Sequence, residues 1–173
     1  DDILLERVYK APVLNESAIT ITSMGQVQSV FSDVDPAVDS IVINFGTEMD
    51  PATVTADSVC LKDATGNKVP ALISKTEKTA TLTPNACLEA GVEYTLFFAK
   101  TVANVLGLTV GESDVTFPIH TNQGRISAAV GTPADEGTKL NIPITYTNST
   151  KADVNPAIIV AYLGANNKLL GID

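Results

Sequence analysis

The sequence contains no tryptophan, only 5% aromatic residues and a single histidine, His120. A zinc site needs several Cys or His ligands, and His120 has neither a second histidine nor a neighbouring cysteine to share a metal ion with. We therefore expect His120 to lie at a solvent-facing strand end. The scarcity of aromatic residues also leaves few candidates for a flat surface on which a sugar ring would stack.

Signatures of catalysis are missing as well. There is no Gly-x-Ser-x-Gly elbow for a serine triad, and neither Cys60 nor Cys87 lies in a cysteine-nucleophile motif. No glycine-rich loop leads into a helix, which excludes the usual phosphate-cradling site. Paired carboxylates for glycoside hydrolysis would need a cleft that the sequence does not predict. We expect no catalytic residues, no bound cofactor and no enzyme activity.

Positive charge is scarce: the sequence has 11 Lys and Arg residues and 20 Asp and Glu residues, which gives a net charge of −9. Nucleic acids bind to basic grooves, so they are not expected partners, and an anionic membrane surface is disfavoured for the same reason. No apolar run reaches the length of about 18 residues that would span a bilayer. We expect a soluble, globular chain without direct membrane insertion.

The length of 173 residues allows one large domain or two small ones. The sequence has no initiator Met and no targeting segment, and we expect it to be a fragment of a longer protein. Two cysteines permit one disulfide, whose loop would stabilise the fold by roughly 3 kcal/mol. The pattern around Cys60 turns its side chain outward and places Cys87 in a turn. We expect two unpaired thiols, with a Cys60–Cys87 bridge as the alternative.

Short strands at steady spacing dominate residues 19–121. Ile41, Ile43 and Phe45 alternate with other residues, as they do in a strand with one buried face. No amphipathic helix of ten or more residues interrupts the series, so we predict an all-β, antiparallel Ig-like β-sandwich. The predicted strands are Ile19–Thr22, Val27–Phe31, Ser40–Phe45, Ser58–Lys62, Val69–Ser74, Thr79–Thr83, Val92–Lys100 and Val115–Thr121.

Local signals predict three features between these strands. Asp50 and Pro51 favour one short helical turn over Pro51–Val54. The stretch from Asp63 to Asn67 predicts a tight turn in which Gly66 takes a positive φ. Leu88, Gly91 and Tyr94 have the spacing of a tyrosine corner, in which the Tyr hydroxyl bonds to nearby backbone, so Tyr94 is predicted to be structural.

The two ends of the chain differ in character from the middle. We expect residues 1–18 to form a leader strand and linker. Alternatively, Asp1–Arg7 resembles the closing strand of a carbohydrate-binding jelly roll and would end a preceding domain. Residues 122–173 predict a smaller, partial β module with a hairpin turn at Gly164–Asn167. This module either packs on the sandwich or has further strands elsewhere. Its predicted strands are Arg125–Val130, Lys139–Thr147, Pro156–Leu163 and Lys168–Ile172.

An ordered set of phrases within residues 40–121 resembles the bacterial Ig-like domains of S-layer, adhesin and polysaccharide-processing surface proteins. The phrases are Ile41–Pro51, Asp63–Pro70, Thr79–Pro84 and Leu88–Tyr94. The stretch Ala103–Leu108 departs from the family, which has an Asp…Gly-Asn turn there, so we expect a differently shaped hairpin and a doubtful ion site. The tail resembles β modules that lie beside such domains in large secreted proteins.

The resemblance implies a non-catalytic structural spacer or adhesive module, located outside the cell or at its surface. It implies neighbouring domains of the same protein as partners, and extracellular polysaccharide or cell wall as further ones. The alternative is a carbohydrate-binding accessory module of a polysaccharide-degrading enzyme, for which Phe97 is the outward aromatic candidate. Calcium is the one metal considered, and its candidate ligands are Asp33, Asp35 and Asp39. Their spacing is not that of an EF-hand, and a solvated acidic turn is the competing interpretation.

Overall fold

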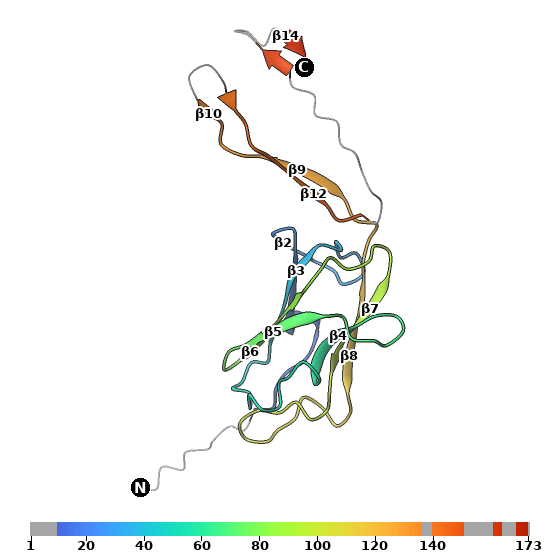
Figure 1. Cartoon of the computed structure of the whole chain (residues 1–173). Helices are drawn as coiled ribbons and strands as arrows, with labels where there is room; N and C mark the ends of the chain where they lie inside the picture. The colour runs from blue at the N-terminus through green and yellow to red at the C-terminus, as the bar shows by residue number, and fades with distance from the viewer. Residues whose placement is uncertain (1–9, 136–139, 151–160, 164–168, 173) are drawn as a thin grey trace, which may run out of the picture.

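The computed structural model describes residues 10–135, 140–150, 161–163 and 169–172 (Figure 1). Two antiparallel sheets pack face to face within the first of these ranges, as in an Ig-like β-sandwich. In spatial order, the five-stranded sheet consists of β2 (Gln26–Val27), β1 (Ile19–Ser23), β3 (Val38–Asn44), β6 (Thr79–Pro84) and β5 (Ala71–Lys75). The three-stranded sheet consists of β4 (Val59–Lys62), β7 (Glu93–Phe98) and β8 (Val115–His120). A single 3-10 turn, η1 (Glu16–Ala18), precedes β1.

Alternating side chains from both sheets fill the core. Ile41, Ile43 and Phe45 are at most 1% exposed, as their alternation predicts. The Phe45 ring, just after β3, meets Phe98 of β7 edge to face with ring centroids 6.4 Å apart. Phe98 meets Phe117 of β8 in the same way at 6.0 Å. Such pairs add about 0.5–1.5 kcal/mol each beyond area burial; the Phe45–Phe98 pair couples the two sheets, and the Phe98–Phe117 pair lies within the three-stranded one.

Most predicted strands are confirmed with ends shifted by one or two residues, but the strand predicted over Val27–Phe31 is wrong. The paired strand β2 ends at Val27, and the chain then leaves the five-stranded sheet. It crosses to β8, where the His120 amide donates to the Phe31 carbonyl at 2.7 Å. The Val34 amide donates to the His120 carbonyl at 2.9 Å, so the crossing segment closes one side of the sandwich.

The turn predicted to be helical over Pro51–Val54 is a single hydrogen-bonded turn. The Thr53 amide donates to the Asp50 carbonyl at 3.0 Å, and the Ala52 amide donates to the Asp50 carboxylate at 2.9 Å. No helix continues from it, because the Thr53 carbonyl accepts the Ser58 hydroxyl at 2.6 Å instead of a backbone amide. Asp50 therefore caps one turn, as predicted.

The turns that begin at Asp63 and at Asn104 have the same pattern of hydrogen bonds. The Asp63 carboxylate accepts the amides of Thr65 and Asn67, both at 2.9 Å. The Asn104 side-chain carbonyl accepts the amides of the residues two and four positions later, Leu106 at 3.0 Å and Leu108 at 2.9 Å. A glycine with positive φ, Gly66 or Gly107, stands three positions after the Asx residue in each. The hairpin at 103–108, expected to differ in shape, thus repeats the bonding of the Asp63 turn.

After the sandwich, within the predicted second module, two strands form a ribbon: β9 (Ile126–Val130) and β12 (Ile144–Asn148). Its register opposes Tyr146 to Ala128 and Ile144 to Val130, which gathers apolar side chains on one face. Shorter pairs follow: β10 (Ala134–Asp135) with β11 (Leu140–Asn141), and β13 (Ala161–Leu163) with β14 (Leu169–Ile172). The predicted strand over Lys139–Thr147 is divided because Pro143 has no amide to give to a ladder. The predicted turn at 164–167 lies outside the described residues.

Candidate functional site

The three calcium candidates do not converge on one point. Asp33 is exposed, whereas Asp35 is 3% exposed. One Asp35 oxygen accepts the Ala37 amide at 3.0 Å, and the other lies 3.0 Å from Arg125 Nε. Asp39 is exposed and accepts the Gly25 amide at 2.6 Å. Within the described part of the chain, no group of three His, Cys, Asp or Glu side chains is placed to hold a metal ion.

Phe97, the glycan candidate, faces outward on β7 but is half-buried. The Lys62 ammonium of the neighbouring strand β4 lies 3.4 Å from the centroid of its ring. This cation–π contact occupies one face of the ring, and a sugar stacking there would have to displace the ammonium. The glycan role of Phe97 stays a prediction, and the geometry gives it no support.

Tyr94 has the predicted structural role. Its hydroxyl accepts the Glu89 amide at 2.8 Å, and the side chain is 5% exposed. The exposed His120 stands opposite Glu93 across the β7–β8 ladder, with Nε2 3.5 Å from the carboxylate. The Tyr94 hydroxyl therefore fixes the backbone before β7, and the exposed His120 lies at the end of β8, as expected.

Both cysteines are free, as expected, and Cys60 lies outside the core cluster that contains Val59 and Leu61, but another segment covers it. Cys60 is 5% exposed because the segment after the Asp63 turn folds back over β4. The Val69 amide donates to the Leu61 carbonyl at 2.8 Å and fixes that segment in place. Burial raises the pKa of the Cys60 thiol.

The most constrained polar cluster joins the sandwich to the β9–β12 ribbon. We call it the junction, and its members are Met24, Asp35, Gly124, Arg125 and Ser149. Arg125 Nε points at the buried Asp35 carboxylate at 3.0 Å and lies 3.3 Å from Met24 Sδ. A buried carboxylate needs a charged or hydrogen-bonding partner, and Arg125, directly before β9, supplies both.

Ser149 fixes the same point from the other strand of the ribbon. Its hydroxyl accepts the Arg125 amide at 2.8 Å, and its own amide donates to the Arg125 carbonyl at 3.0 Å. The preceding Gly124 has φ of +73°, and a Cβ there would lie 2.2 Å from the Ser149 carbonyl oxygen. The chain can leave the sandwich in this direction only with glycine at position 124.

The turn between β1 and β2 contacts the junction through Met24. Met24 and Gly25 have φ of 50° and 70°, the two positive values of a type I′ hairpin. Methionine is unusual in that conformation, and it brings the thioether against Arg125. The Asp39 carboxylate holds the turn through the Gly25 amide. These contacts connect Arg125 to the turn of the β1–β2 hairpin, and that turn to the start of β3.

Sequence reasoning placed a module boundary at Thr121–Gly124 but missed the junction itself. Arg125 directly after that boundary was the available signal, because it is the only arginine in the described part of the chain. Its partner, Asp35, lies 90 residues earlier and had been considered only as a calcium ligand. No local pattern connects the two positions.

Comparison with known proteins adds one finding. A family model described as "Bacterial Ig-like domain" matches residues 15–121, more than half of the chain. No curated protein and no solved structure matches the chain significantly. In the part that the structure describes, no helix is long and apolar enough to cross a membrane.

Proposed function

The chain belongs to the bacterial Ig-like domain family, and from this premise we propose that it is a structural spacer of a bacterial surface or secreted protein. Domains of this family are generally non-catalytic and occur in bacterial surface or extracellular proteins. The spacer positions its neighbouring domains at a set distance and angle. Those domains, and the cell wall or extracellular polysaccharide around them, are its partners.

The junction is the observation that carries this proposal. A spacer transmits orientation only if the connection between consecutive modules is fixed. Here the connection consists of an ion pair to a buried carboxylate, a serine bonded to Arg125 at both its amide and carbonyl, and a glycine that no other residue replaces without a clash. A flexible linker would instead be rich in unpaired Gly and Ser.

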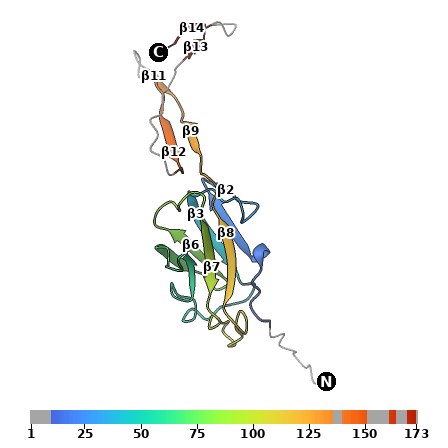
Figure 2. The same cartoon turned by 90° about the vertical axis from the view of Figure 1, so that its right-hand side faces the viewer.

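The course of the chain also suits a spacer. The Asn104 amide group donates to the Lys10 carbonyl at 3.0 Å, which places the start of the described chain at the β7–β8 loop. The junction lies at the other end, beside the β1–β2 turn (Figure 2). Preceding and following modules would therefore attach to opposite ends of the sandwich.

Residual dipolar couplings on the full chain test the rigidity of the junction. We expect the sandwich and the β9–β12 ribbon to report one shared alignment tensor. Gly124→Ala and Arg125→Gln should give separate tensors, with a weaker one for the ribbon, while the amide spectrum of the sandwich stays folded.

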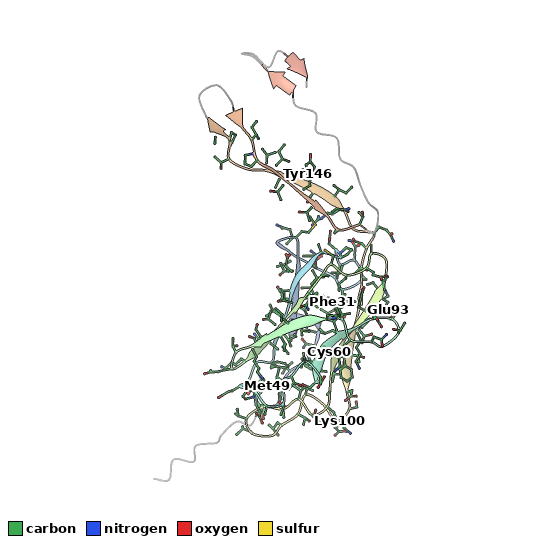
Figure 3. All side chains as sticks on the ribbon, viewed as in Figure 1. Phe31, Met49, Cys60, Glu93, Lys100 and Tyr146 are labelled. Atoms are coloured by element: carbon green, nitrogen blue, oxygen red, sulfur yellow. The ribbon has the colours of Figure 1, made fainter. Side chains whose placement is uncertain are left out.

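Lys100→Gln is the matched control, because it removes an exposed cation at the end of the sandwich far from the ribbon (Figure 3). It should leave the shared tensor unchanged. Independent tensors already in the unmodified protein would contradict the spacer proposal, since the two modules would then move freely.

A further inference from the structure

A groove of about 570 Å³ lies on the side of the sandwich where the chain crosses between the two sheets. We call it the Phe31 groove; the lining residues that matter here are Glu16, Gln28, Phe31, Ser32, Pro118 and His120. Its volume is within the range of about 300–1,000 Å³ that is common for small-ligand sites. Its lining includes neither Phe97 nor a junction residue, although the lining residue Gln28 bonds to Asp35 of the junction.

Backbone bonds hold the floor of the groove in place. The Gln28 amide donates to the Ile21 carbonyl of β1 at 2.8 Å, and the His120 amide donates to the Phe31 carbonyl at 2.7 Å. The crossing segment is thus attached to one strand of each sheet. The Gln28 side chain is fixed as well, between the Gln26 carbonyl at 3.1 Å and the Asp35 amide at 3.3 Å.

The groove stays open because strand β8 is an edge that cannot be extended there. Pro118 lies in the middle of β8 with its ring exposed, and it has no amide to offer to a further strand. Pro118 therefore faces the groove without a ladder partner there, whereas the His120 backbone pairs with the crossing segment and His120 also lines the groove. Pro118 therefore both protects the edge of the sheet from a further strand and keeps the groove open.

The chemistry of the walls is mixed. Phe31 packs against the core, is half-buried and also lines the groove. Pro118 adds a second apolar ring surface. Glu16 is exposed, and its carboxylate has no partner among the described residues. Hydroxyl groups such as that of Ser32 and the imidazole of His120 complete the lining.

This combination selects among ligand classes. An acyl chain would need an apolar wall, and a polyanion would be repelled by Glu16, by Glu93 beside His120 and by the net charge of −9. A pyranose ring complements these walls. Its weakly positive C–H groups suit the negative face of the Phe31 ring, and its hydroxyl groups can donate to the Glu16 carboxylate.

We propose that the Phe31 groove binds a neutral saccharide, with one pyranose ring against Phe31 and Pro118 and its hydroxyl groups donating to Glu16. The ligand would be a segment of an uncharged polysaccharide, since the groove is open at the surface. This proposal does not depend on the spacer function. Failure of one leaves the other standing, because the ligand-contacting residues Glu16, Phe31 and Pro118 are not members of the junction, although the Gln28 side chain accepts the Asp35 amide.

Titration of the isotope-labelled full chain tests the site by heteronuclear NMR, with cellohexaose, xylohexaose, mannohexaose and chitohexaose as the probes. We expect saturable shifts with at least one of them, centred on the amides of Phe31, Ser32 and His120. Glu16→Gln should weaken that binding about tenfold, because it replaces a charged acceptor by a neutral one.

Phe31→Ala should abolish the shifts. If that variant fails to fold, Glu16→Gln still tests the site, because Glu16 is exposed and outside the core. Tyr146→Ala is the matched control, an exposed aromatic on the ribbon that should leave binding unchanged (Figure 3). The proposal is overturned if no probe gives saturable shifts at millimolar concentration, if the shifts centre on Phe97, or if Glu16→Gln binds as tightly as the unmodified chain.

Discussion

Single side chains decide how segments outside the ladders are fixed, and Tyr94 is the clearest case. Its ring lies in the core, while its hydroxyl reaches the Glu89 amide in the loop before β7. The same loop is held by Thr121, whose hydroxyl donates to the Glu89 carbonyl at 2.6 Å. One phenol and one hydroxyl thus close the link between β6 and β7.

Tyr94→Phe removes the acceptor of the Glu89 amide and leaves the ring packing intact. We expect the free energy of unfolding to fall by about 1 kcal/mol, the usual net value of one hydrogen bond. Urea denaturation followed by circular dichroism measures it. Tyr146→Phe, at an exposed position of the ribbon, should change nothing; an equal loss in both variants would contradict a structural role specific to Tyr94.

The two thiols should differ in reactivity. Burial raises the pKa of Cys60, and the nearby Lys62 and Lys68 oppose that shift only in part. Since the thiolate is the reactive form, iodoacetamide at neutral pH should modify the exposed Cys87 first and Cys60 at least about tenfold more slowly. Mass spectrometry over time gives both rates.

Denaturation in guanidinium should make the two cysteines alkylate alike, and Cys87→Ser should leave only the slow phase. Equal rates in the native protein would show that the segment over Cys60 opens freely. The sequence could not reveal this protection. Alternation with Val59 and Leu61 assigns Cys60 to the outer face, and the cover comes from a segment that follows a turn.

At the scale of elements, the turns at Asp63 and Asn104 form the same bonds with different chemistry. The Thr65 hydroxyl, and then the amides of Asn67 and Thr65, lower the pKa of the Asp63 carboxyl. Asn104 uses an amide carbonyl, which does not titrate. Asn104 is 1% exposed, and its amide group is already engaged with Lys10, so a neutral side chain suits the buried position.

Acid should therefore loosen the Asp63 turn alone. Because the folded pKa of Asp63 is lowered, its contribution to stability is present above the unfolded value of about 3.9 and is lost as the pH falls through the folded pKa. The amide shifts of Thr65 and Asn67 should titrate below a pH of about 3.9, the ordinary pKa of an Asp side chain. Those of Leu106 and Leu108 serve as controls and should stay constant; parallel titration of both turns would contradict the assignment.

Sequence patterns predicted a strand correctly where the alternation of its own residues decides which side chains are buried. They failed where a segment distant in the sequence forms the backbone hydrogen bonds. The alternation of Ile41, Ile43 and Phe45 reports a strand because neighbouring positions face opposite sides of one sheet. The pattern of Val27–Phe31 is equally strand-like. There, bonds to His120, far along the chain, draw the segment out of its sheet. Periodicity does not include such non-local partners.

At the scale of the whole molecule, the described hydrophobic core belongs to one module. Its buried members extend from Ile19 to Ile119, and none comes from the described residues after β8. The ribbon touches the sandwich through the polar junction instead. The boundary between modules that the sequence predicts at Thr121–Gly124 stays a prediction. The contact between Arg125 and Asp35 required the fold.

A shortened chain that ends after Arg125 should consequently keep the cooperative unfolding of the sandwich. We expect its melting temperature to lie within about 5 °C of the main transition of the full chain, because no core side chain is removed. Differential scanning calorimetry on both proteins makes the comparison. A broad, non-cooperative transition in the shortened chain would show that residues beyond the junction contribute to the core.

The attachment of neighbours at opposite ends also determines how the sandwich would respond to tension. Strand β1 starts at the end where the chain arrives, and β8 finishes at the end where it departs. Pulling on the two neighbours would draw each strand along its own axis against its antiparallel partner. The ladder bonds are perpendicular to that direction, so they would shear together instead of opening one by one. In a cell-surface protein exposed to flow, this arrangement would make the module an extension-resistant segment.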